Sequence, residues 1–286
     1  MKILTTKFLL IIVISMSNFN GFAQEQETQK YTAKNKGKYV ISWGGNRESY
    51  SKSDITFKGD DYSFTLQDVK AHDKPKGWHI DYINPTALTI PQTNFKLGYF
   101  ISNHYLISVG VDHMKYVMTQ NQTANIKGEI NLPIEQLGSA FNGTYNNVTI
   151  QLTEDFLKFE HTDGLNYINT EISRVDDISS IFKIKNIDKI QINLTEGVGV
   201  GLLFPKTNTT LLQKERYDEF HVAGYGASVR VGLNFTFFKH FFIQTDLKGG
   251  YINMNDIRTT NSTSDSASQH FFFFQRIISL GGVFRL

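Results

Sequence analysis

The chain has 286 residues, of which 40% are hydrophobic, 13% aromatic and 20% charged, with 29 Lys and Arg against 27 Asp and Glu and no cysteine. This length allows one large domain or two small ones, and the aromatic content with only five prolines argues against a proline-rich disordered chain. The lack of cysteine excludes disulfides, zinc–thiolate sites, iron–sulfur clusters, a cysteine nucleophile and a lipidated cysteine anchor.

The first 23 residues have the pattern of a secretory signal peptide. Lys2 and Lys7 precede the apolar run 8–16, and small residues stand where a signal peptidase needs them, at Gly21 and Ala23. The apolar run is about half the roughly 20 residues of a membrane-spanning helix. We therefore expect Sec export and cleavage between Ala23 and Gln24 rather than a retained anchor.

The mature chain is formally neutral, because removing Lys2 and Lys7 leaves 27 basic and 27 acidic side chains. A neutral chain has no global field that attracts nucleic acid, so no nucleic-acid partner is expected. After the signal there is no apolar run of 18 residues. A membrane-spanning mature chain would therefore have to be a closed barrel, in which no strand edge is left open to lipid.

Residues 24–36 are polar and predict a periplasmic leader, whereas alternation of period two dominates residues 37–286 and predicts an all-β domain. The segment 119–165 is expected outside the membrane as one long loop or an extra hairpin. The earlier strands are predicted at 38–50, 54–69, 78–83, 95–102, 105–118, 166–175 and 189–204.

The last three predicted strands, 222–237, 241–251 and 272–286, have the clearest alternation. In the first of them Tyr225 and Val229 share an apolar face, while Ser228 and Arg230 lie on the opposite face. Strands of about 12 to 16 residues exceed the usual 5 to 6 and are long enough to cross a bilayer. We predict an antiparallel transmembrane β-barrel of about ten strands, with 8 to 14 allowed. The alternative is a soluble sandwich or lipocalin-like barrel, which would have shorter strands.

The connections between strands alternate in length. The segments 205–220 and 253–269 are long and polar, whereas the turns at 103–104 and 239–240 are short. Outer-membrane barrels have long outer loops and short periplasmic turns, which sets the expected orientation. A ring of about ten strands also predicts a filled, polar lumen, because porin-width channels need about 16 strands.

The Phe-Ala-Gln at the signal end, the aromatic-rich alternation and the final residues 281–286 resemble outer-membrane β-barrel proteins of the Bacteroidota. Such proteins end in a strand with apolar residues at every second position, which the barrel assembly machinery reads. Leu286, Phe284, Leu280 and Ile278 fit this pattern, and Gly282 is a gap. The resemblance implies location in the cell outer membrane, contact with lipid and lipopolysaccharide, and the assembly machinery as a partner.

A candidate catalytic segment runs through Glu160, His161, Thr162 and Asp163 where a strand is expected to reach the outer rim. It resembles the rim motif of lipid A deacylase barrels, which implies His161 as a general base and Asp163 as its carboxylate partner. Asp163, however, stands where that family has its serine nucleophile. The alternatives are a tight turn at Asp163 and Gly164, or a metal site formed by Glu160, His161 and Asp163.

Two further groups of residues are candidates for other roles. His113 and Lys115 are expected near the outer rim, either contacting lipid or substrate or as ordinary interface residues. A luminal charge network is predicted because narrow barrels fill their interior with paired side chains. Its predicted members are Arg47, Asp54, Arg230, Asp246, Lys248 and Arg285.

Together these observations predict an integral outer-membrane barrel with a structural, lipid-contacting or partner-binding role, including an envelope protein as a partner. The alternative is a lipid-modifying acyl hydrolase that acts through His161 and Asp163. A third interpretation is a narrow channel for small solutes. No cofactor and no metal are expected, since the sequence has no P-loop, GxSxG or HExxH motif.

Overall fold

The computed structural model describes residues 31–77 and 92–286. The predicted signal peptide, leader residues 24–30 and the predicted strand 78–83 lie outside the described residues. Within the described residues the helical segments are three 3₁₀ turns: η1 (Tyr31–Ala33), η3 (Leu137–Phe141) and η4 (Ser179–Phe182). No helix in this part of the chain is long and apolar enough to cross a membrane.

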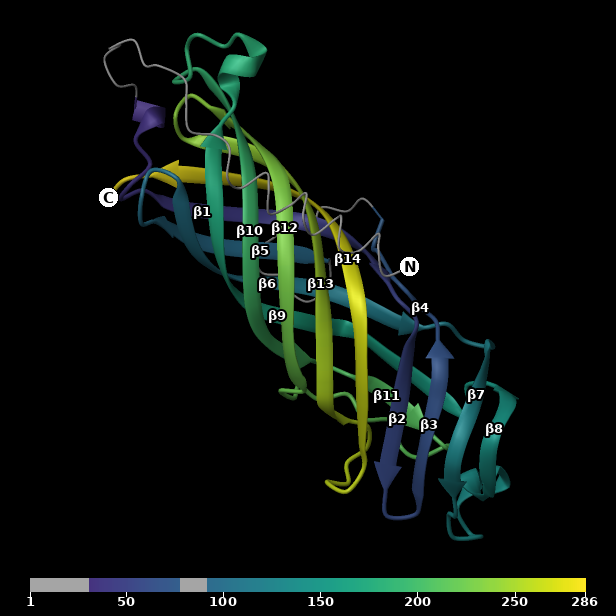
Figure 1. Ribbon diagram of the computed structural model, residues 1–286. Helices are drawn as coiled ribbons and strands as arrows, with labels where there is room; N and C mark the ends of the chain where they lie inside the picture. Colours follow the sequence, from purple (N-terminus) through teal and green to yellow (C-terminus); the bar gives the residue numbers. More distant parts are fainter. Residues whose placement is uncertain (1–30, 78–91) are drawn as a thin grey trace. The chain divides into compact units, whose positions relative to one another are not determined.

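Eight strands form a closed antiparallel ring, in which neighbours follow chain order and the last strand pairs back with the first (Figure 1). The ring is an up-and-down meander whose closure leaves no open edge. Its strands are β1 (Tyr39–Tyr50), β5 (Thr93–Phe100), β6 (Tyr105–Met118), β9 (Leu157–Asp177), β10 (Ile190–Pro205), β12 (Gly224–Phe237), β13 (Phe241–Arg258) and β14 (Ser266–Phe284).

The other strands lie at one end of the ring, which we call the extended end. There β14 pairs with β2, and the sheet continues in the order β2, β3, β7, β8. In Figure 1 this sheet lies at the opposite end from the C-terminus. The opposite end, which has the turns 101–104 and 238–240, is called the short-turn end. The additional strands are β2 (Ser53–Gly59), β3 (Tyr62–Val69), β4 (Ala71–His72), β7 (Thr123–Ile130), β8 (Gly143–Gln151) and β11 (Asn208–Leu211).

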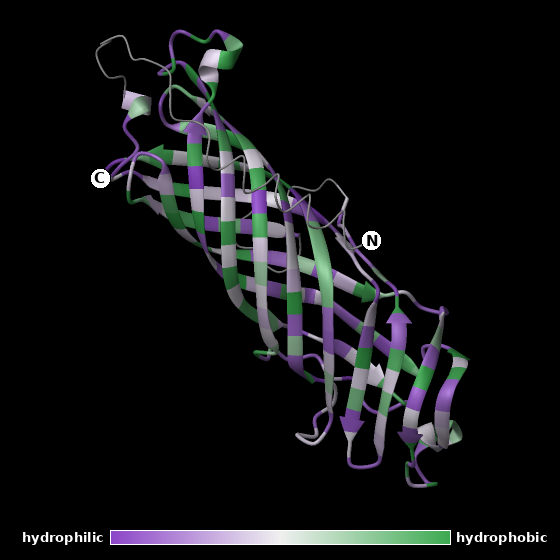
Figure 2. Cartoon of the chain, in the orientation of Figure 1, coloured by the Kyte–Doolittle hydropathy of each residue, from purple (hydrophilic) through white to green (hydrophobic). Residues whose placement is uncertain are grey.

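The wall of the ring is apolar outside and polar inside. Outward residues such as Phe241, Val200 and Phe272 are 64–69% exposed, whereas the inward Arg230 and Asn234 are buried. Figure 2 shows the resulting alternation of apolar and polar positions along β10, β12 and β13. An apolar belt around a polar lumen is the pattern of a barrel surrounded by lipid. The chain is therefore an antiparallel transmembrane β-barrel.

The predicted fold class is confirmed, but the strands are divided differently from the prediction. The ring has eight strands and the sheet fourteen, against about ten predicted. The predicted strand 54–69 is the hairpin β2–β3, because the chain turns between Gly59 and Tyr62. The segment 119–165 contains β7, β8 and the start of β9. The predicted outer loop 253–269 is shorter than expected, since β13 continues to Arg258 and β14 begins at Ser266.

The extended end has an apolar core of its own. Phe57, Phe64 and Phe159 are fully buried there, with ring centroids 5.3 and 5.7 Å from Phe57. A smaller apolar cluster lies inside the ring at the short-turn end and includes Phe100 and Phe242. The polar part of the lumen is therefore enclosed between two apolar layers.

Candidate functional site

Arg230 on β12 lies at the centre of an ion-pair network in the lumen. Its guanidinium contacts Glu171 of β9 at 2.7 Å (Nη2–Oε1) and Asp246 of β13 at 2.5 Å (Nη1–Oδ1). Nε donates a further bond to Glu171, and the hydroxyls of Ser173 and Thr195 accept two more. All five N–H donors of the guanidinium are thus used, which compensates the burial of its charge.

Two lysines complete this network. Lys96 of β5 contacts Glu171 at 2.9 Å (Nζ–Oε1), and Lys248 of β13 contacts Asp112 of β6 at 2.5 Å (Nζ–Oδ2). Together with Arg230 and Asp246, these groups comprise three cations and three carboxylates. The network is electrically balanced, so it can fill a narrow lumen without leaving a net buried charge.

Glycines on two neighbouring strands make room for the network. A Cβ added at Gly232 would lie 2.0 Å from Oδ1 of Asp246, and one at Gly197 would lie 2.9 Å from Oε1 of Glu171. Both positions face the lumen, where any side chain would displace a carboxylate. The glycine alternation of β10 therefore provides space for the side chains of the lumen.

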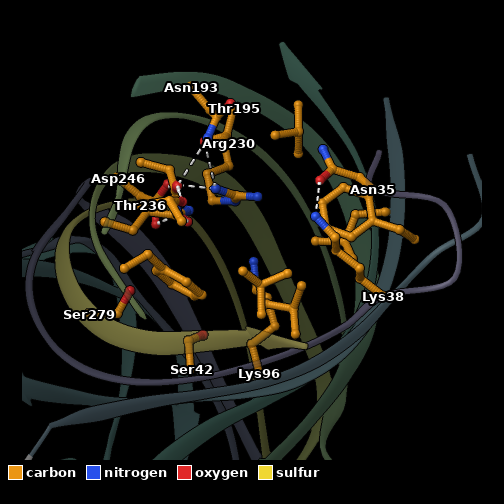
Figure 3. A pocket seen from close by; sticks show the side chains of 18 of the residues that line it. Asn35, Lys38, Ser42, Lys96, Asn193, Thr195, Arg230, Thr236, Asp246 and Ser279 are labelled. Atoms are coloured by element: carbon orange, nitrogen blue, oxygen red, sulfur yellow. Dashed lines mark hydrogen bonds and ion pairs between the residues drawn. The ribbon is translucent and has the colours of Figure 1, made fainter. Parts of the chain in front are cut away.

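A cavity of about 70 Å³ lies next to the network and is lined by Lys96, Asn193, Thr195 and Arg230 (Figure 3). It is large enough for several water molecules, at about 10–15 Å³ each. Its lining also includes Lys38, whose Nζ donates to the Tyr31 carbonyl at 2.9 Å and to Asn35 Oδ1 at 3.1 Å.

The segment 31–38 covers the short-turn end of the lumen. Thr32 donates through its hydroxyl to Asp188 at 2.8 Å, in the connection between β9 and β10. An eight-stranded ring is just wide enough for side chains to fill. The network and this N-terminal cap occupy that space, which does not favour the interpretation as a solute channel.

Of the six residues predicted to form a luminal network, the structure places Arg230, Asp246 and Lys248 in the lumen. The other three require a correction. Arg47 points outward because its neighbour Asn46 points inward, and it pairs in register with the outward Arg276 of β14. Asp54 lies on β2 in the extended end, where it accepts a bond from the Asp68 backbone N–H. Arg285 follows β14 and donates to the Lys36 carbonyl at 2.7 Å.

His161 is fully buried in the core of the extended end and does not lie at a rim. Its ring packs edge-on against Phe159 and close to Tyr116, with Nδ1 3.0 Å from the Thr207 hydroxyl oxygen. Burial lowers the pKa of His161 to about 3, so the ring is neutral at physiological pH. A lipid substrate cannot reach this imidazole in the arrangement seen here.

The structure does not bring Asp163 to His161. The Asp163 carboxylate is half-exposed and lies 3.9 Å from Lys206 Nζ, while Glu160 accepts a bond from Asn208 at 2.8 Å. Gly164, at φ +143°, forms a bulge within β9, and the pairing with β6 skips a residue nearby. The segment is thus a bulged strand rather than a tight turn, and its three predicted metal ligands contact different partners.

His113 and Lys115 lie on β6 near the level at which the ring becomes the extended end. His113 is only 3% exposed, with Nδ1 2.8 Å from the side-chain oxygen of Asn166. It therefore does not face the lipid, contrary to the prediction. Lys115 is half-buried.

Sequence reasoning missed Glu171, which accepts two hydrogen bonds from Arg230, and Lys96, which forms an ion pair with Glu171. Both lie on the polar face of an alternating strand, Glu171 between Asn169 and Ser173 and Lys96 two residues before Gly98. That alternation was the available signal. The prediction bounded these two strands but did not assign their faces.

The strand β8 is the free edge of the extended end. It pairs only with β7, and no other strand in the described residues joins its second edge. Most of its residues are exposed, including Val148 at 48%, and its sequence GTYNNVTIQ has neither charge nor proline. Natural edge strands are usually protected by lysine or proline, and β8 has neither. Asn147, at φ +57°, adds a bulge that divides the strand.

No protein-family model matches the sequence, and a search of curated proteins finds no similar one. Solved structures do resemble it. Ail, the attachment invasion locus protein of Yersinia pestis, is 13% identical over 87% of this chain and 99% of its own, with a TM-score of 0.32. OprG from Pseudomonas aeruginosa is 8% identical over 89% and 99%, with a TM-score of 0.38. The outer membrane protease OmpT from Escherichia coli is 6% identical over 91% and 100%, with a TM-score of 0.24.

Proposed function

We propose that this protein is an integral outer-membrane barrel whose extended end binds an extended segment of an envelope or extracellular protein at β8. The observation that carries the proposal is the free edge of β8. A strand edge offers unpaired backbone N–H and C=O groups, and an extended peptide can add to it as a further strand. The short-turn end would face the periplasm, in keeping with the C-terminal strand pattern.

The extended end is built as a rigid support for such an edge. Its sheet is attached to the barrel through β14 and is backed by the aromatic core around Phe57 and Phe159. Rigid secondary-structure elements position a binding edge more precisely than loops do. The bulge at Asn147 limits strand addition to a short segment on either side, such as Val148–Gln151.

Neither alternative function has comparable support. A hydrolase needs an accessible base, whereas His161 is fully buried and separate from Asp163. A channel needs a continuous polar path, whereas the ion pairs of Arg230 cross the lumen. The edge at β8, by contrast, is exposed and uncharged.

The test places a photo-crosslinking amino acid at Thr149 in cells that express the full chain. We expect a discrete crosslinked protein that is also captured when the purified components are mixed. Val148→Lys should abolish the crosslink, because a charge on the edge opposes strand addition. Asn125→Lys adds the same charge on the paired strand β7, opposite Thr149, and should preserve it.

The proposal is overturned if the folded protein gives no specific crosslink from any β8 position, or if both lysine variants behave alike. Lipid A mass spectra of cells with wild type and His161→Ala, together with conductance in planar bilayers, test the two alternatives. Loss of a lipid A acyl chain that depends on His161 would support the hydrolase in place of the binding function, and a steady ion current would support the channel.

A further inference from the structure

Glu48 and Asp73 form a pair of carboxylates at the outer end of the lumen, next to the network of Arg230. Glu48 is 5% exposed, and its backbone N–H donates to Asp73 Oδ2 at 3.0 Å. The side-chain amide of Gln92 bridges the two residues, donating to Glu48 and, at 2.5 Å, to Asp73 Oδ1. The two carboxylates therefore lie on opposite sides of one amide group.

This pair differs from the other luminal carboxylates in having no cation. Glu171, Asp246 and Asp112 each contact an Arg or Lys within 2.9 Å. Within the described residues, no Lys, Arg or His nitrogen lies within 4 Å of Glu48 or Asp73. Glu48 is buried and Asp73 is partly exposed; two neighbouring carboxylates repel each other, and a positive charge or a shared proton relieves the repulsion.

The amides around this pair have oxygens without partners. Gln275 of β14 donates through Nε2 to Glu48 Oε1 at 3.1 Å, and both Gln275 and Gln92 are fully buried. The Oε1 atoms of these two glutamines accept no hydrogen bond. Because Nε2 of each amide faces the carboxylates, each Oε1 points away from them and is left as a buried acceptor without a donor, which is uncommon in folded proteins.

A divalent cation fits all of these features. The assignment of amide N and O follows from the hydrogen-bond network, so turning either amide would direct its oxygen at the carboxylates. With a cation present, two carboxylates and two amide oxygens become ligands, and the charges balance. Ca²⁺ accepts such oxygen ligands in flexible geometry, and among the described residues the pair has no sulfur or imidazole neighbour of the kind that softer metals favour.

We propose that Glu48, Asp73, Gln92 and Gln275 bind Ca²⁺ at the outer end of the lumen. The four residues come from β1, the segment after β4, the residue before β5 and β14. The ion therefore connects the seam at which the ring closes to the chain that leads into and out of the extended end. This site is separate from β8 and does not depend on the proposed function.

The test uses the full mature chain, refolded in detergent without lipopolysaccharide and treated with EGTA. We measure Ca²⁺ binding by titration calorimetry and Tb³⁺ binding by luminescence, for which Tyr50 on β1 is the expected sensitiser. Gln275→Ala keeps the charge balance and should weaken binding at least tenfold, and Glu48→Gln or Asp73→Asn should weaken it further. Asp163→Asn, which alters a carboxylate outside the lumen, should leave it unchanged.

Calcium should also raise the thermal unfolding temperature of wild type with a dependence on concentration, because a ligand of the native state stabilises that state. The inference is overturned if EGTA and Ca²⁺ leave that temperature unchanged, or if Gln275→Ala binds as tightly as wild type. A shared proton would instead give no Ca²⁺ binding and a stability that rises as the pH falls.

Discussion

The ring and the extended end share long strands, among them β9, β13 and β14, but have opposite interiors. In the ring, β14 directs Gln275 and Ser279 into the lumen and Ile278 and Leu280 outward. Nearer the start of the same strand, in the extended end, Phe271 points inward and His270 points outward. The alternation continues without a break, so only the chemistry of the two faces changes.

This inversion shows which solvent surrounds each region. Where the outside is lipid, an apolar wall is favoured and the enclosed polar groups must pair with each other, as Arg230 does with its two carboxylates. Where the outside is water, the usual arrangement returns, with Phe57 and Phe159 inside. The two regions therefore owe their stability to different interactions, and each can be disrupted separately.

The largest expected effect is in the extended end. Phe57→Ala removes a fully buried ring and should destabilise that region by about 4 kcal/mol, since such truncations typically cost 3–5 kcal/mol. Limited proteolysis should then cut the β2–β3 and β7–β8 hairpins, while the ring keeps its heat-modifiable migration. Simultaneous loss of the ring would show that the two regions unfold as one.

In the ring, Arg230→Met should cost about 3 kcal/mol in urea unfolding, because it leaves the buried carboxylate of Asp246 without its cation. The double variant Arg230→Met with Asp246→Leu removes that carboxylate, and Glu171 keeps its contact with Lys96. It should recover most of the loss. Equal stability of the single and double variants would contradict the pairing described for the lumen.

The pH dependence should separate the regions as well. His161 has a folded pKa of about 3 against an unfolded value near 6.5, so the unfolded state binds its proton first. Stability should therefore fall as the pH drops from 6.5 towards 3, by up to about 1.4 kcal/mol per unit from this group. His161→Phe should remove this contribution, and identical slopes for the two proteins would refute it.

The smallest effect is expected for an exposed ion pair of the same chemistry. Arg216 contacts Asp218 at 3.0 Å on the surface, with its side chain 55% exposed. Arg216→Ala should change the free energy of unfolding by less than about 0.5 kcal/mol, because water and salt screen such pairs. A loss of stability near that of Arg230→Met would mean that burial does not determine how strongly these arginine–carboxylate pairs stabilise the protein.

The sequence predicted the wall of the barrel well, because lipid on one side forces a strict alternation. Arg230, Asp246 and Lys248 were assigned to the lumen from the parity of their strands alone. The number of ring strands was not predictable in the same way. The strands of the extended end also alternate, so β2 and β3 looked like part of the ring.

The candidate sites were harder to predict because they depend on which strands are neighbours. Small residues on both faces of β1, such as Gly44 and Gly45, hide the parity that directs Arg47 outward and Glu48 inward. Likewise, the bulge at Gly164 interrupts the pattern that would have assigned His161 to an apolar core. Glu48 and Gln275 are 227 residues apart, and only the closure of the ring brings them together.

That closure also sets an order of folding. β14 pairs along its length with β1 and then with β2, both of which are made first. The free edge of β2 in the hairpin β2–β3 can pair only after residues 266–269 of β14 have been made. One edge of β1 likewise pairs only with β14. One edge of β1 and one edge of β2 therefore stay unpaired until the last strand is made, and forming such distant pairs is the step expected to be slow.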